Sequence, residues 1–220
     1  MRSAAQRSGG PEVRLVAVSK TKPASDVREA YDAGQRDFGE NYVQEVLEKA
    51  PVLPQDIRWH FIGHLQSNKV KALIEGVPSL FMVQTVDSEK LANKLDSAVS
   101  AAQRGPLSVL VQVNTSGEES KYGVVPEACV ALAQHIVRNC SNLHLAGLMT
   151  IGMPDYSSRP ENFACLADCR KQVADSVGLE ESDLELSMGM SGDFEAAIEM
   201  GSTNVRVGST IFGARVYPNK

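Results

Sequence analysis

The feature that most constrains the fold of this chain is a regular alternation between short β-rich runs and longer helical runs. Eight short runs are rich in β-branched, aromatic or aliphatic residues, at residues 13–19, 36–39, 58–62, 81–86, 107–114, 143–150, 184–188 and 204–208. Segments of helical character lie between them, at residues 24–33, 42–50, 67–75, 88–103, 126–139, 159–177 and 194–200. This alternation predicts a parallel sheet covered by helices.

Several strand runs are apolar almost throughout, such as LSVLVQV at residues 107–113, as expected for strands covered on both faces. Eight such strands in 220 residues predict an α/β fold, a single compact (β/α)8 barrel of the triosephosphate isomerase type. The domain is expected to span residues 1–220, with residues 1–10 disordered or the remnant of an N-terminal helix. An open doubly wound sheet is the alternative, but no glycine-rich dinucleotide fingerprint follows the first strand run.

The composition indicates which classes of binding partner this chain can have. The net charge is −5 and no basic run occurs, which argues against a nucleic-acid-binding face. No apolar run approaches the roughly 20 residues needed to cross a bilayer, and residues 1–10 lack the apolar centre of a secretory signal. The expected partner is therefore a small molecule or another protein, and the chain is expected to be a monomer.

The four cysteines, Cys129, Cys140, Cys165 and Cys169, lack the spacing of a zinc site or a disulfide framework. We expect reduced, mostly buried thiols. These fit a cytoplasmic location, with mitochondria or another organelle left open.

In a barrel of this type, functional residues lie at the carboxyl ends of the strands, and phosphate sites lie after strands seven and eight. The first strand run ends at Ser19 and is followed directly by Lys20. A lysine at a strand end is usually solvated. The functional alternative is a partly buried amine that forms a Schiff base with an aldehyde, with Lys22 lowering its pKa further.

The seventh and eighth strand runs are followed by groups that suit a phosphate. Ser191 and Gly192 stand where a helix starting near residue 194 would have its N-cap, so Ser191 either caps that helix or meets a phosphate. Gly208, Ser209 and Thr210 offer a close backbone and two hydroxyls, a second phosphate contact.

Arg206 is a charge inside an apolar strand run, which is costly unless the charge is paired. It predicts either an ion pair with an acid such as Glu199 or a donor to a bound ring or anion. His60 and His64 share no helix face and do not predict a zinc pair; a hydrogen-bonding role near the barrel mouth is expected for His64. Taken together, a lysine after strand one and Ser/Gly donors after strands seven and eight are what a barrel holding a phosphorylated aldehyde requires.

Several segments resemble one family. VAVSKTKP, DFGENYVQE, WHFIGHLQSNK, VNTSGEESKYG, GLMTI, LSMGMSGDFEAAI and GSTNVRVGSTIFGAR are similar, in this order, to segments of the pyridoxal phosphate homeostasis proteins, and the similarity runs from residue 13 to 215. It implies a fold like the N-terminal barrel of bacterial alanine racemase and pyridoxal 5′-phosphate (PLP) as the cofactor. The residues implied to bind it are Lys20 as the Schiff base, Asn41 and Met149 near the ring, Arg206 facing the pyridine nitrogen, and Ser191, Gly208, Ser209 and Thr210 at the phosphate.

The resemblance also implies a role in intracellular PLP homeostasis and supply, with PLP-dependent apoenzymes as candidate recipients and no established enzymatic activity. Two departures stand out: only residues 1–10 remain for the helix that often precedes strand one, and Gly208-Ser209-Thr210 replaces the common Gly-Thr-Ala.

Little turnover is expected, because Arg206 cannot accept the ring proton as a carboxylate would and the ring is then a weak electron sink. The β domain that supplies the racemase's catalytic tyrosine has no counterpart before Lys220. The alternatives are a slow PLP-dependent racemase or lyase, a sugar-phosphate aldolase with a Schiff-base lysine, and a protein-binding module without a cofactor.

Overall fold

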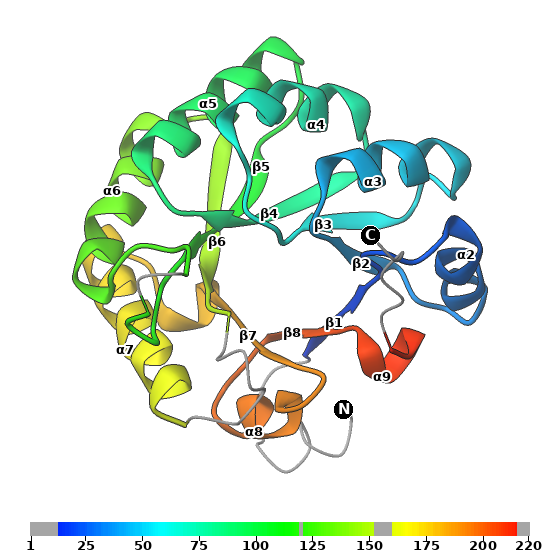
Figure 1. The fold of residues 1–220 in the computed structure, drawn as a ribbon. Coiled ribbons are helices and arrows are strands. Elements are labelled where there is room, and N and C mark those ends of the chain that lie inside the picture. The colour runs from blue at the N-terminus through cyan, green and yellow to red at the C-terminus, as the bar shows by residue number, and fades with distance from the viewer. Residues whose placement is uncertain (1–12, 119–120, 152–159, 215–220) are drawn as a thin grey trace.

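The computed structural model of this protein describes residues 13–118, 121–151 and 160–214. Within these ranges eight parallel strands form one closed barrel in sequence order (Figure 1). The strands are β1 (Arg14–Val18), β2 (Asp37–Glu40), β3 (Arg58–Phe61), β4 (Leu80–Val86), β5 (Leu107–Gln112), β6 (Leu143–Met149), β7 (Glu185–Met190) and β8 (Asn204–Val207).

Helices follow the strands and form an outer ring around the barrel, as Figure 1 shows. They are α2 (Ala24–Asp32), α3 (Val43–Lys49), α4 (Val70–Gly76), α5 (Glu89–Ala101), α6 (Cys129–Asn139), α7 (Pro160–Val177), α8 (Phe194–Glu199) and α9 (Ser209–Phe212). Short 3₁₀ turns lie at Ala50–Val52, Ser67–Lys69, Pro126–Ala128 and Glu181–Asp183.

The closure of the sheet decides between the two predicted architectures. β1 pairs in parallel with β8, from Arg14 opposite Asn204 to Ala17 opposite Val207. The (β/α)8 barrel is therefore confirmed and the open doubly wound sheet is wrong. All eight predicted strands and all seven predicted helical segments are present, although the segments predicted from residues 67 and 126 begin with a 3₁₀ turn. The short helix α9 was not predicted.

Apolar residues at helical spacing seal the barrel from outside. In α5, for example, Leu91, Ala92, Leu95 and Val99 are buried, and Ser88 caps the helix by accepting a hydrogen bond from the Leu91 amide at 3.3 Å. This stripe belongs to the main apolar core between helices and strands. A smaller cluster, Met82, Leu110, Ala146 and Met149, lies on strands β4 to β6.

The barrel interior also holds polar side chains. Gln84 on β4 accepts a hydrogen bond from Ser187 on β7 at 2.6 Å, although these strands are not neighbours, so the contact crosses the interior. Both residues are fully buried. The inside of the barrel is therefore a packed layer with a polar path through it and not an open channel.

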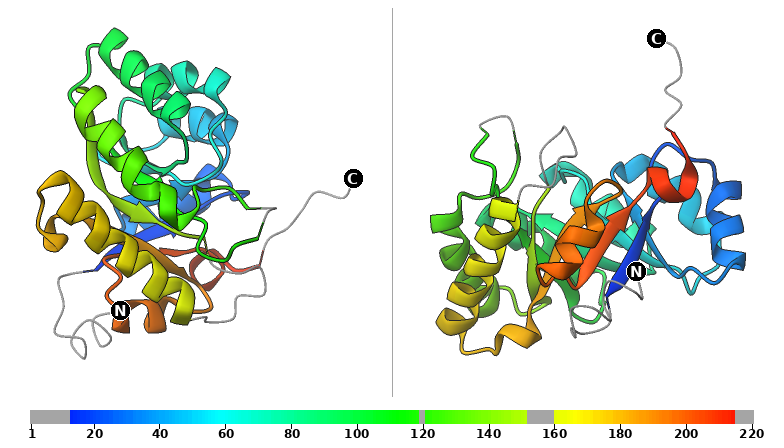
Figure 2. Two further views of the ribbon diagram at one scale, coloured as in Figure 1. Left: turned by 90° about the vertical axis from the view of Figure 1, so that its left-hand side faces the viewer. Right: turned by 90° about the horizontal axis from the view of Figure 1, so that it is seen from below.

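The four cysteines are free thiols, as expected, and Cys129, Cys140 and Cys169 are buried. Among the described helices, none has both the length and the apolar character needed to cross a membrane. Residues 1–10, expected to be disordered or the remnant of a helix, lie outside the described residues. α9 lies at the same end of the barrel as the segment that follows β5 (Figure 2, right).

Candidate functional site

A cavity of about 400 Å³ lies where the barrel rule places it, at the carboxyl ends of the strands. Its lining comes from β1, β7 and β8 and from the segments that follow β1, β2, β3, β6, β7 and β8. The lining residues are Val18, Lys20, Lys22, Asn41, Ile62, Ile151, Met190, Ser191, Arg206, Gly208, Ser209, Phe212 and Gly213. Six of the eight residues singled out from the sequence are in this set. A lysine, a buried arginine and two serines therefore share one enclosure.

The turn that carries Lys20 is strained. Lys20 follows β1 and is half-buried, and the next residue, Thr21, has φ of +63°. This left-handed conformation is rare for a β-branched residue. Lys22 lines the same cavity, as the sequence suggested, and its Nζ donates to the carbonyl oxygen of Ala214 at 3.0 Å.

A cluster of charged side chains, Lys49, Glu40 and Glu45, forms hydrogen bonds to the residues on both sides of Lys20. Lys49 Nζ donates to the carbonyl oxygen of Ser19 at 2.9 Å, to Glu40 Oε1 at 2.7 Å and to Glu45 Oε2 at 2.7 Å. Glu45 Oε2 also accepts the Thr21 amide at 2.8 Å, and Glu40 Oε1 accepts the Ser19 hydroxyl at 2.7 Å. The residues on both sides of Lys20 are thus fixed by side-chain hydrogen bonds, which explains how the strained backbone of Thr21 is held.

The cluster makes Glu40 a pH-sensitive part of the fold. Burial raises the pKa of Glu40 to about 7, although Lys49 and Ser19 lower it. Between pH 4.5, the ordinary pKa of a glutamic acid, and about 7, Glu40 keeps its proton in the folded state but loses it in the unfolded chain. The contribution of Glu40 to stability therefore falls as the pH rises through this range. We expect Glu40→Gln to remove this pH dependence of the free energy of unfolding, which amounts to roughly 3 kcal/mol in total. The variant should also be less stable overall, because the charge of Lys49 loses one of its partners.

Urea unfolding of the parent and the variant between pH 5 and 8 measures this difference. Glu48→Gln is the matched control, because Glu48 is an exposed carboxylate on α3, the helix that carries Lys49, and its substitution should leave the slope unchanged. Identical slopes in the parent and in Glu40→Gln would show that Glu40 does not titrate in this range.

The segments after β7 and β8 are tied together by Ser191. Its Oγ accepts the amide of Gly208 at 3.0 Å, which leaves the hydroxyl proton of Ser191 to be donated elsewhere. The N-cap expectation for Ser191 is wrong: α8 starts at Phe194 with Asp193 as its N-cap, and Asp193 Oδ1 accepts the Met190 amide at 2.6 Å. The helix starts too late for Ser191 to reach its first amides.

Arg206 is only 4% exposed and reaches the cavity from inside the barrel. Its Nη1 donates to Ser187 Oγ at 2.5 Å and its Nη2 to the carbonyl oxygen of Thr150 at 2.6 Å. Burial lowers the pKa of Arg206 to about 10, and the carboxylate that acts against this shift is Asp193, not the predicted Glu199. The side chain is therefore still a cation at neutral pH.

Two of the residues singled out from the sequence do not line the cavity. Met149 is fully buried, because it lies two residues deeper on the same face as Ile151 and packs in the cluster with Met82 and Leu110. Thr210 is the second residue of α9 and is exposed, while its neighbour Ser209 lines the cavity.

The two histidines have separate places. His64 stacks on Tyr122 with ring centroids 3.6 Å apart, and its Nδ1 lies 3.6 Å from Asp87 Oδ2. It lies outside the cavity lining, whereas His60 is fully buried inside the barrel. Among the described residues, no group of histidine, cysteine and acidic side chains is arranged to hold a metal ion.

Sequence reasoning missed the residues that support the lining. Glu40, Glu45 and Lys49 were not singled out, because the run before Glu40, Arg36-Asp37-Phe38-Gly39, is too polar to mark a buried acid in the way that the run around Arg206 marks a buried cation. Gly63 was also missed: a Cβ there would lie 2.0 Å from the carbonyl oxygen of Asn41, so only glycine lets the loop after β3 pack on the segment carrying Asn41.

Comparison with known proteins agrees with this geometry. A family model described as "Alanine racemase, N-terminal domain" matches residues 1–216. The human protein named pyridoxal phosphate homeostasis protein is 53% identical over 218 residues, covering 94% of this chain and 78% of its own length. Its namesake in Vibrio cholerae is 46% identical, covering 98% and 92%. This chain belongs to the pyridoxal phosphate homeostasis protein family.

Solved structures give the same assignment. PipY of Synechococcus elongatus, described with PLP bound, superposes with a TM-score of 0.73 at 35% identity and covers 96% of this chain and 98% of its own. An alanine racemase from Clostridium difficile shares only the fold, with a TM-score of 0.72 at 15% identity and coverage of 100% and 56%. The family resemblance and the barrel type expected from the sequence are thus both confirmed.

Proposed function

We propose that this protein binds PLP in the cavity at the carboxyl end of the barrel, as a Schiff base on Lys20, and takes part in the intracellular supply of the cofactor with little turnover of its own. The observation that carries the proposal is the convergence of Lys20, Arg206, Ser191 and Ser209 on one cavity. Family membership supports it, since relatives carry the name of PLP homeostasis proteins and PipY is described with PLP bound.

The donor set fits this cofactor. PLP needs an amine for its aldehyde, donors for a phosphate dianion and polar contacts at its ring. A volume of about 400 Å³ lies within the usual range of small-molecule sites. In addition, Asn41 Oδ1 is buried without a hydrogen-bond partner among the described residues, and Asn41 lines the cavity. A buried acceptor of this kind is costly unless a ligand donates to it.

Each lining residue has a distinct part in the proposal. Lys20 supplies the amine, on a turn fixed by Lys49 and Glu45. Ser191 and Ser209 supply hydroxyl donors for the phosphate at the ends of β7 and β8, with Gly208 between them positioned by Ser191. Arg206 faces the ring, where its guanidinium can donate hydrogen bonds but cannot accept them.

Bound PLP supplies an electron sink that acidifies the α-carbon of amino acids. In the proposed arrangement the group next to the ring is the Arg206 cation, which cannot act as a general acid and cannot accept the ring proton as a carboxylate would. We therefore propose that the protein carries the cofactor with little turnover. Fast racemisation of alanine by the unmodified holoprotein would overturn this part.

We also propose a cytoplasmic location, supported by four free thiols, and PLP-dependent apoenzymes as the recipients. We further propose that the chain acts as a monomer.

The direct test is a titration of cofactor-free protein with PLP and, in parallel, with pyridoxal, which lacks the phosphate. We expect PLP to produce a saturable visible absorbance change at one molecule per chain. Pyridoxal should bind at least a hundredfold more weakly, because it leaves at least two donors to the phosphate without a partner. Equal affinity for the two ligands would exclude the phosphate site.

A further inference from the structure

A continuous chain of hydrogen bonds runs through the barrel interior, from the cavity at the carboxyl ends of the strands to the opposite end of the barrel. Arg206 Nη1 lies 2.5 Å from Ser187 Oγ, Ser187 Oγ lies 2.6 Å from Gln84 Oε1, Gln84 Nε2 lies 3.0 Å from His60 Nδ1, and His60 Nε2 lies 2.9 Å from Asp37 Oδ1. The five side chains come from β8, β7, β4, β3 and β2. We call them the relay.

The relay is closed to solvent. Ser187, Gln84 and His60 are fully buried, and its two ends, Arg206 and Asp37, are 4% and 5% exposed. Water therefore cannot compensate for a hydrogen bond that points the wrong way. Each donor in the relay must meet an acceptor, because an unsatisfied buried polar group costs more than a hydrogen bond gains.

The two ends fix the direction of every bond between them. Arg206 can only donate, so Ser187 Oγ accepts there and gives its own proton to Gln84 Oε1. The amide nitrogen of Gln84 must then donate to His60 Nδ1, which has to be unprotonated. The single ring proton of His60 lies on Nε2 and is donated to Asp37.

The reverse arrangement fails at both ends. If the Gln84 amide were turned round, Ser187 would accept from Gln84 and from Arg206 and its proton would lose the Gln84 acceptor. His60 would then carry its proton on Nδ1 and present a lone pair to the carboxylate of Asp37. Two acceptors facing each other in a dry interior are strongly unfavourable.

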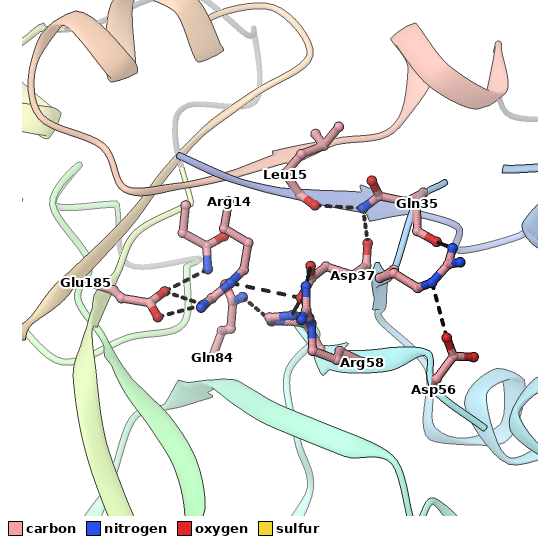
Figure 3. Close-up of polar contacts among 11 residues, drawn as sticks. Arg14, Leu15, Gln35, Asp37, Asp56, Arg58, Gln84 and Glu185 are labelled. Carbon is pink, nitrogen blue, oxygen red and sulfur yellow. Dashed lines mark hydrogen bonds and ion pairs between the residues drawn. The ribbon is translucent and has the colours of Figure 1, made fainter. Parts of the chain in front are cut away.

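Asp37 is held as the accepting anion by its surroundings. Arg58 forms an ion pair with it, and Arg14 Nε lies 3.9 Å from its Oδ1. Figure 3 labels Arg14, Asp37 and Arg58 among the polar side chains at this end of the relay. Burial would raise the pKa of Asp37, but hydrogen bonds from His60 and Arg58 lower it to about 2. Burial lowers the pKa of His60, which favours its neutral form.

At the other end, the charge of Asp193 acts on Arg206 without an ion pair between them. The hydrogen bonds of Arg206 go to the oxygen atoms of Ser187 and Thr150, and the described residues provide no ion pair for it. The aligned dipoles of the relay therefore connect the cation at the cavity to the anion at the far end of the barrel. The donors of the relay therefore all point from Arg206 toward Asp37, and the reverse order would leave the Ser187 proton without Gln84 and the Asp37 carboxylate without a donor from His60.

We propose that Asp37, His60, Gln84 and Ser187 are positioning residues that fix Arg206 in the cavity through hydrogen bonds whose donors all point from Arg206 toward Asp37. This inference rests on the proposed function only for its effect on cofactor binding. Its structural core, the Nε2-protonated neutral form of His60, concerns the protein alone and can be tested without any ligand.

The first measurement is the ¹⁵N NMR spectrum of the ring nitrogens of His60, in unmodified protein labelled at histidine and assigned with His60→Gln. We expect a neutral ring at neutral pH, protonated at Nε2 and bare at Nδ1. A proton on Nδ1, or on both nitrogens, would overturn the proposal whatever the protein binds. Asp37→Asn keeps an amide oxygen that can accept from Nε2 and leaves the Arg206 end unchanged, so the same tautomer should persist. Its loss in a folded variant would count against a direction that is set at both ends.

The second measurement is PLP affinity in Gln84→Met, which keeps the volume and cuts the relay in the middle. We expect about a tenfold loss, the effect of one weakened hydrogen bond to a charged group. Gln112→Met is the matched control, since Gln112 is also buried (2% exposed) but bonds to the carbonyl oxygen of Tyr122 outside the relay.

Equal affinity in the two glutamine variants would overturn the positioning role. Failure of the unmodified protein to bind PLP would instead refute the proposed function. The tautomer of His60 would still show whether the hydrogen bonds of the relay have the proposed direction.

Discussion

Lys20→Ala is expected to abolish the visible absorbance of the PLP-loaded protein and its covalent labelling by borohydride. Alanine has no amine to condense with an aldehyde. The loss should be nearly complete at ligand concentrations that saturate the parent. Mass spectrometry of the reduced parent, digested to peptides, should place the cofactor on the peptide that contains Lys20.

Lys22→Ala is the matched control, because Lys22 is a second lysine that lines the same cavity, with its Nζ donating to the carbonyl oxygen of Ala214. This variant should keep the absorbance band and the label. Thermal unfolding of both variants without cofactor separates lost binding from lost folding. A label found on Lys22 or Lys121 in the parent would reject Lys20 as the attachment point.

Ser191→Ala and Ser209→Ala are each expected to weaken PLP binding roughly tenfold to a hundredfold, because each removes a donor to a dianion worth about 1.5–3 kcal/mol. The two substitutions differ in the apoprotein. Ser191→Ala also leaves the amide of Gly208 without its acceptor and should lower the unfolding temperature, whereas Ser209 is exposed and should tolerate the change.

Pyridoxal supplies the control on the ligand side. If the serines act on the phosphate, their substitution should change pyridoxal affinity far less than PLP affinity. Calorimetric titration of parent, single and double variants with both ligands measures this. An equal loss for both ligands would mean that the serines shape the cavity without contacting a phosphate.

Much of the fold follows from local sequence patterns. The apolar runs that became β1 and β5 and the helical period of α5 are visible without tertiary information, because strand and helix periodicity are properties of neighbouring residues. The predicted ends of some elements differ from those in the structure. The seventh strand, for example, was predicted to end at Met188, but β7 continues to Met190. The short α9 contains Ser209 and Thr210, which read as loop residues in the sequence.

The candidate site was predictable where one rule applied. Placing functional groups at the carboxyl ends of parallel strands pointed to Lys20, Ser191, Gly208 and Ser209, and the structure brings these into one cavity. The rule says nothing about depth along a strand. Met149 was expected near the ring and lies one layer below the lining, where Ile151 takes its place.

By itself, the sequence determined the alternation of elements, the closed barrel as the better of two architectures and the lysine that begins the site. Only the tertiary structure decided what holds that site. The relay joins residues that are 19, 103, 24 and 23 positions apart, and the clamp on the Lys20 turn joins Lys49 to Ser19 across 30. Such partners depend on the register between strands and on which side chains share a layer of the barrel interior. Hydrogen bonds act over about 3 Å, so no local pattern in the chain specifies them.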